Sequence, residues 1–284
     1  MEPKPAWLRQ TLPVGPAFEK TRTLLIACGL ETVCQEARCP NQWECYSQKT
    51  ATFLLLGAVC TRNCRFCSVR SGKPAPLDRD EPNRIAHAVD ALGLQYVILT
   101  SVTRDDLPDG GAMAFANTIR AIRKRIANAT IEVLIPDFGG NRAALQHVVG
   151  AQPDVIGHNM ETVARLYPLV RPEANYERSL QVLTDIATMD SRMVRKTGVM
   201  LGLGETNEEL ERLLLDIVTA GGQFLTLGQY LQPDKEALPV ADYIAPEKFD
   251  NWKVIAEKIG FAQVASGPFV RSSYKARYLY DAHR

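Results

Sequence analysis

The cysteines are the residues of this sequence whose type and spacing point most directly to chemistry. The chain has 284 residues and seven cysteines, all of which lie between Cys28 and Cys67. Clustered thiols in a reducing compartment more often bind metal or take part in catalysis than form disulfides. Six of the seven form two triplets, Cys34-x4-Cys39-x5-Cys45 and Cys60-x3-Cys64-x2-Cys67.

The spacing of the triplets favours iron–sulfur clusters over zinc. A structural zinc site needs four ligands, which usually come as two short cysteine pairs or include histidines. None of the four histidines lies in the cysteine-bearing segment. Three thiolates on a four-iron cluster leave one iron open to a substrate or to a different ligand. Zinc, with a distant fourth ligand for each triplet, is the alternative.

Composition and charge argue against several classes of protein. Lys plus Arg number 33 and Asp plus Glu 32, so a net charge of +1 makes nucleic acid a poor partner. Apolar runs such as Phe53 to Val59 are far shorter than the roughly 20 residues that span a bilayer. The N-terminus mixes charge and proline and lacks the apolar region of a secretory signal. We therefore expect a cytoplasmic protein without nucleic-acid or membrane partners.

The elements that must position the cysteines alternate from residue 52 onward. Periodicity predicts helices near 83–93, 111–127, 141–150, 160–167, 175–189, 207–220 and 246–260. It predicts buried strands at Thr52–Gly57, Gln95–Thr100, Ile131–Pro136, Asp154–His158, Thr197–Leu203, Phe224–Gln229 and Gln263–Ser266.

This alternation is typical of a parallel sheet covered by helices, either a full or partial barrel or an open sheet. Residues 1–50 show little periodicity, and we expect an irregular cap there. In such folds ligands bind at the carboxyl ends of the strands. The second cysteine triplet follows the first predicted strand directly, so it lies at that end.

Two motifs resemble those of the radical S-adenosylmethionine (SAM) enzymes. Cys60-x3-Cys64-x2-Cys67, with Phe66 before its last cysteine, resembles the cluster-binding loop of that superfamily. The segment from Gly198 to Glu205 resembles its G-x-I-x-G-x-x-E element, with Met200 in place of isoleucine. The resemblance implies that the open iron chelates the methionine moiety of SAM. Reductive cleavage of SAM then yields a radical that abstracts hydrogen from unactivated carbon.

Further stretches over nearly the whole chain resemble the lipoyl synthases within that superfamily. They include the first triplet, Thr100–Gly111, His158–Val163, Leu227–Pro233 and Arg271-Ser272-Ser273-Tyr274. Two departures concern loop shape: Gln42-Trp43 stands where Ile-Gly is expected, and Thr103 where Asp is commoner.

The family resemblance implies a partial (β/α)6-type TIM barrel with irregular N-terminal and C-terminal extensions. Residues 1–50 would carry the auxiliary-cluster cysteines, 51–265 the barrel, and 266–284 the Arg-Ser-Ser-Tyr motif. The first triplet and Ser273 would hold an auxiliary 4Fe-4S cluster that supplies sulfur. The reaction implied is insertion of two sulfur atoms, at C6 and C8 of an octanoyl chain that is amide-linked to a carrier lysine.

Site residues follow from the same resemblance. Cys60, Cys64, Cys67 and Ser273 would be catalytic, and Lys196 and Arg171 could bind a carboxylate. We interpret His158 as a packing or hydrogen-bonding residue, Cys28 as a small buried residue, and Asp105, Asp106 and Asp109 as loop or helix-cap residues. The residues expected to contact SAM are Phe66, Ser101, Asn159, Glu161, Arg171, Lys196, Gly198, Met200, Gly202 and Glu205.

The implied cofactors are two 4Fe-4S clusters and SAM. The implied partners are octanoylated carrier domains of 2-oxoacid dehydrogenase E2 subunits and of the glycine cleavage H protein. An electron donor such as ferredoxin or flavodoxin and an iron–sulfur carrier protein would also be needed. Two alternatives stay open at this point: a methylthiotransferase of the same superfamily acting on RNA or protein, and a zinc-stabilised binding module without catalysis.

Overall fold

A curved, all-parallel sheet forms the centre of the molecule. The structure is a computed structural model and describes residues 5–9, 15–48 and 50–284. Every neighbouring pair of strands is parallel, and the order in space is the order in sequence. The strands are β1 (Thr52–Leu55), β4 (Tyr96–Ser101), β5 (Thr130–Leu134), β6 (Val155–Gly157), β7 (Val194–Leu201), β8 (Phe224–Gln229) and β9 (Gln263–Gly267).

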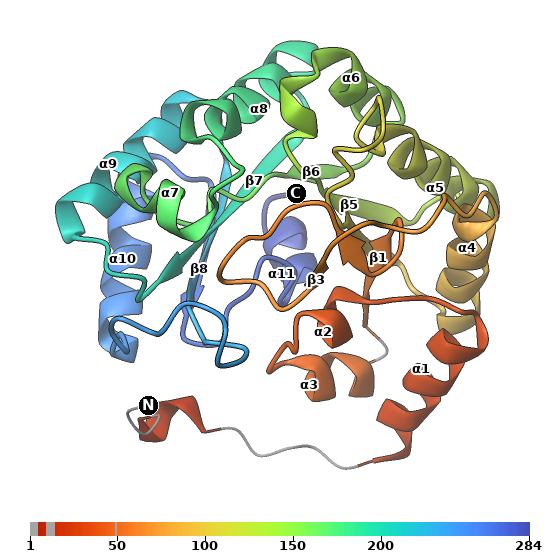
Figure 1. Cartoon of the computed structure of the whole chain (residues 1–284), viewed down its shortest axis with the longest axis horizontal. Coiled ribbons are helices and arrows are strands. Elements are labelled where there is room, and N and C mark those ends of the chain that lie inside the picture. Colours follow the sequence, from red (N-terminus) through yellow and green to blue (C-terminus); the bar gives the residue numbers. More distant parts are fainter. Residues whose placement is uncertain (1–4, 10–14, 49) are drawn as a thin grey trace.

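Amphipathic helices connect the strands and cover the outer face of the sheet. In Figure 1 they form a ring outside the strands. Each helix buries apolar side chains that are three or four residues apart. In α9 (Asn207–Thr219) these are Leu210, Leu213, Leu214 and Ile217. The covering helices are α4 (Glu81–Leu92), α5 (Ala112–Arg125), α6 (Arg142–Gly150), α8 (Tyr176–Met189), α9 (Asn207–Thr219) and α10 (Pro246–Ile259).

The sheet is a partial barrel, as the sequence predicts. Strands β1 and β9 are its two edges, and six βα units precede β9. The seventh predicted strand, Gln263–Ser266, is therefore present and extends the six-stranded unit by one parallel strand. Because all strands run the same way, their carboxyl ends lie at one mouth of the barrel.

The expectation of an irregular N-terminal cap is wrong. This segment contains α1 (Pro16–Ala27), α2 (Val33–Glu36) and α3 (Gln42–Ser47), preceded by a short 3-10 turn, η1 (Ala6–Leu8). In α1 the residues Phe18, Thr21 and Leu25 are buried at helical spacing. Phe18 stacks on Trp43 with ring centroids 4.2 Å apart. Helices α2 and α3 have only four and six residues, too few to leave a visible period, and in α1 the exposed Ile26 next to the buried Leu25 blurs the apolar pattern.

The helix expected at 160–167 is also wrong. Glu161 instead pairs with β7, donating its N–H to Gly198 O at 2.9 Å and accepting from Met200 N at 2.8 Å. These bonds form an isolated bridge to β7, and the positive φ of 66° at Glu161 is incompatible with a right-handed helix. Helical structure begins only at η3 (Ala164–Leu166) and continues in α7 (Tyr167–Val170). Strand β7 in turn begins three residues before its expected start at Thr197.

The C-terminal segment returns into the barrel. Helix α11 (Ala276–Asp281) appears inside the ring of strands in Figure 1. Leu279 and Tyr280 pack against Val155, Val194 and Phe224, which come from three neighbouring strands. Helix α11 thereby closes the end of the barrel opposite the strand carboxyl ends. Within the described residues, no helix is long and apolar enough to cross a membrane.

Candidate active site

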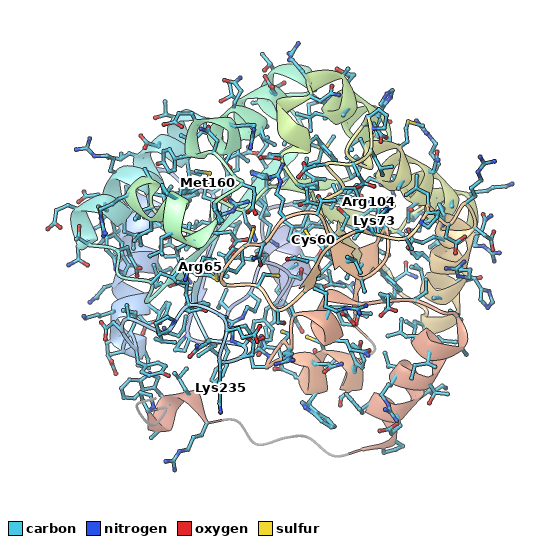
Figure 2. All side chains as sticks on the ribbon, viewed as in Figure 1. Cys60, Arg65, Lys73, Arg104, Met160 and Lys235 are labelled. Carbon is cyan, nitrogen blue, oxygen red and sulfur yellow. The ribbon has the colours of Figure 1, made fainter. Side chains whose placement is uncertain are left out.

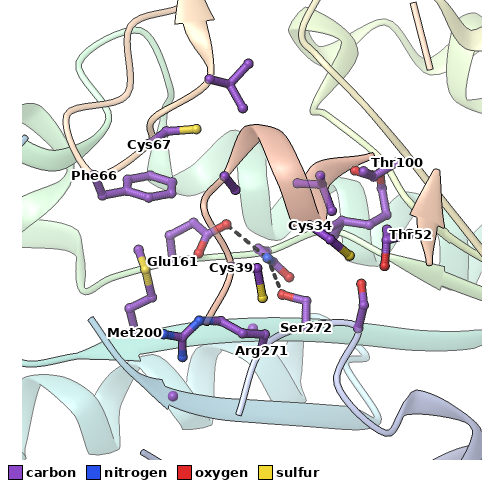
Figure 3. A pocket seen from close by; sticks show the side chains of 18 of the residues that line it. Cys34, Cys39, Thr52, Phe66, Cys67, Thr100, Glu161, Met200, Arg271 and Ser272 are labelled. Carbon is purple, nitrogen blue, oxygen red and sulfur yellow. Dashed lines mark hydrogen bonds between the residues drawn. The ribbon is translucent and has the colours of Figure 1, made fainter. Parts of the chain in front are cut away.

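The two cysteine triplets, remote in sequence, line one cavity. The cavity has a volume of about 500 Å³ and lies at the carboxyl ends of the strands. Figure 3 shows Cys34 and Cys39 on one side of it and Cys67 with Phe66 on the other. The cavity lining includes all six triplet cysteines and Ser273. Cys28 is half-buried against the core outside the cavity.

The second triplet occupies a loop that follows β1 and crosses the barrel mouth, where Cys60 is labelled in Figure 2. The loop is closed by a two-stranded parallel sheet of β2 (Val59–Cys60) and β3 (Arg70–Ser71). Its last two cysteines are joined by a turn in which Cys67 N donates to Cys64 O at 3.0 Å. Backbone pairing at the base of the loop thus brings the three thiols to the same side.

The first triplet is built on two short helices. Cys34 lies on α2, which Thr32 caps by accepting from Gln35 N at 3.3 Å. Cys39 follows in a turn, donating its N–H to Cys34 O at 3.0 Å, and Cys45 lies on α3. Helix α2 packs against β1, with Thr32 paired to Phe53 of that strand, and α3 packs against α1, so the triplet lies beside the first strand.

Two hydrogen bonds join this segment to the C-terminus. Asn41 Nδ2 donates to Phe269 O at 2.7 Å, and Tyr274 OH donates to Glu44 Oε2 at 3.0 Å. The two contacts flank the serine pair of the Arg-Ser-Ser-Tyr motif. They bring Ser273 to the cavity wall that carries the first triplet.

Four of the triplet thiols are held in the protonated form by burial in the absence of a bound cation. Burial raises the pKa of Cys34 and of Cys64 to about 11, and that of Cys45 and of Cys67 to about 12. A coordinated metal ion deprotonates such a thiol outright. Among the described residues, no three His, Cys, Asp or Glu side chains surround one point closely enough for a single ion. The thiolates of a cluster bind separate irons and therefore stand further apart.

A polar site adjoins the second triplet at the ends of β6 and β7. Asn159 Nδ2 donates to Glu161 Oε1 at 2.9 Å and to Ser272 Oγ at 2.7 Å, the dashed lines in Figure 3. Arg171 Nη1 donates to the carbonyls of Asn159 and Met160 at 2.9 and 3.3 Å. A Cβ at Gly198 would lie 2.9 Å from both Asn159 Oδ1 and Ser272 Oγ, so a larger residue would displace these two side chains.

Three buried polar atoms of the cavity lining have no hydrogen-bond partner among the described residues. They are Ser101 Oγ, Arg171 Nε and His158 Nε2. Buried polar atoms are nearly always paired in native proteins, so these three favour a polar ligand in the cavity. The six thiols, the unpaired polar atoms and the apolar side chains of Phe66 and Met200 fit an iron–sulfur cluster with a polar cofactor beside it.

Several of the expected cofactor-binding residues lie where the sequence predicts. Phe66, Ser101, Asn159, Glu161, Arg171, Gly198 and Met200 all line the cavity. Lys196, Gly202 and Glu205 are not among the residues that line the cavity. Lys196 forms an ion pair with Glu132 of β5 instead. Nζ lies 2.7 Å from Oε1, and both side chains are buried.

Gly202 and Glu205 have structural roles in the loop after β7. The Glu205 carboxylate accepts from Gly202 N at 2.6 Å and from Leu203 N at 2.9 Å. Gly202 adopts a φ of 96°, and a Cβ there would lie 2.3 Å from Asp242 O. The motif therefore shapes the strand end beside the cavity.

Asp105, Asp106 and Asp109 lie in the loop between β4 and α5, in agreement with their interpretation as loop or helix-cap residues. Asp109 accepts from Gly111 N and Met113 N at the start of α5. Asp106 pairs with Arg104, and Asp105 pairs with Arg62 of the cysteine loop. Roles for Arg62 and Ser272 are not predicted from the sequence. Arg62 lies between Cys60 and Cys64, and Ser272 precedes Ser273, and these positions next to candidate ligands could have indicated them.

The interpretation of His158 as a hydrogen-bonding residue is confirmed. Its side chain is buried, and Nδ1 donates to Ile135 O at 2.9 Å. This bond leaves Nε2 as the unpaired acceptor facing the cavity.

Comparison with known proteins agrees with the geometry. The model of the Radical SAM superfamily matches residues 54–217. The solved structure of Streptococcus suis SuiB bound to S-adenosylmethionine superposes with a TM-score of 0.60 at 9% identity, over 79% of this chain and 54% of that one. Methylornithine synthase superposes with a TM-score of 0.55 at 13% identity, over 94% and 85%. At such identities these structures support the fold alone.

Fold and site together are those of a radical SAM enzyme, which uses SAM and a 4Fe-4S cluster. The lipoyl synthase of Desulfotalea psychrophila is 54% identical over 98% of this chain and 93% of its own length. That of Caldicellulosiruptor saccharolyticus is 54% identical over 96% of both chains. The chain belongs to the lipoyl synthase family. This membership removes the methylthiotransferase and zinc-module alternatives.

Proposed function

We propose that this chain inserts two sulfur atoms, at C6 and C8, into an octanoyl chain that is amide-linked to a carrier-domain lysine. The observation that carries the proposal is the meeting of both cysteine triplets at one cavity. A radical generator and a sulfur source must both reach the same saturated carbons. One shared cavity satisfies that requirement, and it also keeps water from the reacting atoms.

The second triplet is the proposed ligand set of the radical-generating cluster. Cys60, Cys64 and Cys67 supply three thiolates and leave one iron open for SAM. When bound, cluster and SAM supply the one-electron chemistry that an unactivated C–H bond requires. We assign Ser101, Asn159, Glu161, Arg171 and the apolar Phe66, Gly198 and Met200 to holding SAM, because all seven line the cavity.

Cys34, Cys39, Cys45 and Ser273 are the proposed ligands of a second, auxiliary 4Fe-4S cluster that supplies the sulfur. Support comes from the two hydrogen bonds that join the C-terminal segment to the first triplet's segment. A hydroxyl is a harder ligand than a thiolate and suits iron less well. The serine vertex is therefore the one that this chain releases most easily when sulfur leaves.

The proposed organisation assigns 1–50 to the auxiliary ligands, 51–265 to the barrel and 266–284 to the serine motif. Residues 1–4, 10–14 and 49 of the first segment lie outside the described residues. We propose carrier domains of 2-oxoacid dehydrogenase E2 subunits and of the glycine cleavage H protein as substrates. A ferredoxin or flavodoxin as electron donor and an iron–sulfur carrier protein complete the partners. Thiols that must stay reduced to bind iron favour the cytoplasm.

The proposal is tested by incubating the anaerobically reconstituted protein with reductant, SAM and an octanoyl-lysine peptide. We expect the peptide to gain two sulfur atoms by mass spectrometry, with SAM consumed. SAM cleavage without a sulfur-containing peptide would refute the octanoyl substrate. A protein that is colourless and free of iron after reconstitution would refute the enzyme reading as a whole.

Ser273→Ala tests the auxiliary ligand set, with Ser272→Ala as its matched neighbour. We expect Ser273→Ala to retain SAM cleavage and the cluster of the second triplet but to lose most sulfur insertion. Ser272 Oγ is bonded to Asn159, so Ser272→Ala is expected to affect SAM binding instead. Equal product yields from Ser273→Ala and the wild type would remove Ser273 from the mechanism.

A further inference from the structure

Arg62 lies between the first two cysteines of the second triplet and is almost fully buried, with 7% of its side chain exposed. Its guanidinium forms two parallel bonds to Asp105, Nε to Oδ2 and Nη2 to Oδ1, both at 2.8 Å. Nη2 also donates to Asp137 Oδ1 at 2.7 Å. One side chain of the cysteine loop thus binds the loops after β4 and β5 together. A lysine could not make this set of bonds, because it lacks the planar fork.

Asp137, the fully buried one of the two carboxylates that Arg62 binds, is itself held in place. Asp137 is fully buried and accepts from Arg178 Nε of α8 at 2.8 Å and from Gly139 N at 3.1 Å. Although burial alone would raise its pKa, the hydrogen bonds and charge of Arg62 hold the pKa of Asp137 well below its usual range. Asp137 is therefore a fixed anion on the sheet, against which Arg62 docks.

Asp105, which Arg62 binds, also takes part in the contacts that hold the sulfur of Cys60. Thr61 donates from N and from Oγ1 to Thr103 O, both at 3.0 Å, and Asp105 N donates back to Thr61 Oγ1 at 3.0 Å. This pairing places Thr103 N 3.3 Å from Cys60 Sγ, to which it donates. Arg62 N donates to the same sulfur at 3.4 Å.

We propose that Arg62 is a positioning residue that holds Cys60 Sγ against two backbone N–H donors and thereby sets the reduction potential of the cluster on this loop. The proposal rests on the proposed function, in which Cys60 is a cluster ligand. Hydrogen bonds to cluster sulfurs are one of the factors that set the potential. They withdraw charge from the thiolate and stabilise the reduced, more negative cluster. Loss of Arg62 therefore shifts the potential to more negative values.

The first test uses the protein without iron. Arg62→Gln removes both ion pairs and leaves a shorter, uncharged polar side chain. At a pH at which the Cys60 thiol is deprotonated in both proteins, we expect alkylation of Cys60 by iodoacetamide, followed by peptide mass mapping, to become severalfold faster, because the sulfur is no longer held against two N–H groups. The rates for Cys34, Cys39 and Cys45 in the same molecule should stay at the wild-type values.

Arg178→Gln is the matched control for this test. It breaks an ion pair of 2.8 Å, close to the 2.7 Å of Arg62, to the same buried Asp137, but from α8 and without touching the cysteine loop. We expect its Cys60 rate to stay near that of the wild type. An unchanged rate in Arg62→Gln, or an equal rise in Arg178→Gln, overturns the proposal.

The second test measures the potential of the reconstituted cluster by redox titration with electron paramagnetic resonance. To isolate one signal, the three cysteines of the first triplet are replaced by alanine in every sample. We expect a shift to more negative potential in Arg62→Gln, a smaller shift in Arg62→Lys, and the parent value in Arg178→Gln. If Arg62→Gln does not fold, Arg62→Lys carries both tests. Equal potentials in the parent and the Arg62 variants overturn the proposal.

The two tests separate this inference from the proposed function. If the parent protein binds no cluster on the second triplet, the proposed function fails, whatever the alkylation rates show. If the parent binds a cluster whose potential does not respond to Arg62, only the role of Arg62 fails.

Discussion

His158 shows how a single cavity-facing residue is defined by its surroundings. It is buried beside Arg171, and Ile135 O accepts its Nδ1 proton. Burial, and then the positive charge of Arg171, lower its pKa from 6.5 to about 4. The imidazole is therefore neutral at physiological pH, with Nε2 free to accept a hydrogen bond from a bound ligand.

This lowered pKa predicts a pH dependence of stability. Between pH 6.5 and about 4 the unfolded chain binds a proton at His158 that the folded chain does not. The free energy of unfolding therefore decreases as the pH is lowered through this window. The loss across this window is at most about 3 kcal/mol. We expect His158→Gln to lose less stability than the wild type when urea unfolding of the iron-free protein is compared near the two ends of the window. Parallel pH profiles of the two proteins would contradict this role.

At the scale of elements, the loop after β7 depends on one backbone conformation. Gly202 has a φ of 96°, and the Glu205 carboxylate binds two N–H groups of the loop. Thr206 and Glu209 then form a capping box that begins α9. The glycine-rich motif is therefore a strand-to-helix turn that shapes one side of the cavity.

Gly202→Ala is expected to be strongly destabilising. The positive φ alone costs about 1–2 kcal/mol for a residue with a side chain, and the new Cβ would meet Asp242 O at 2.3 Å. Gly139→Ala is a matched control, because it has a positive φ of 63° and no atom within 4 Å of its Cβ position. We expect a clearly larger drop in urea midpoint for Gly202→Ala. Equal drops would show that the close contact is unimportant.

At the scale of the whole molecule, the C-terminal segment connects the two ends of the barrel. It passes the cavity at Ser272 and Ser273 and ends in α11 at the opposite end. There Tyr280 packs edge-on against Tyr96, whose hydroxyl donates to Glu132 Oε2 at 2.5 Å. Glu132 in turn pairs with Lys196. The packing of α11 at the amino ends of the strands thus anchors the segment that carries the serine motif.

Tyr280→Ala should weaken this anchor. Loss of the partly buried ring is expected to reduce the free energy of unfolding by about 2 kcal/mol. Tyr278→Ala on the same helix is the control, since that side chain is 72% exposed and should change stability little. Urea unfolding of both variants measures the difference. Similar stability of the two variants would show that α11 does not pack as described.

The sequence by itself determined the positions of the candidate ligands and the order of the main elements. Cysteine spacing is local, and buried strands alternating with amphipathic helices leave a clear period, so both triplets and the parallel sheet were predictable, whereas periodicity did not separate a barrel from an open sheet. Helices α2 and α3 were not predictable, because four and six residues carry too little periodicity, and the tertiary pairing of Glu161 with β7 overrides the local helical pattern.

Only the tertiary structure decided which remote residues meet. Asn41 and Phe269 are 228 positions apart, yet their hydrogen bond brings the serine motif to the first triplet. Lys196 lies two residues before Gly198 but below the cavity, where it pairs with Glu132. The partners of Arg62 come from two other loops. Such contacts depend on the curvature of the sheet and the path of the chain, and no spacing within one segment encodes them.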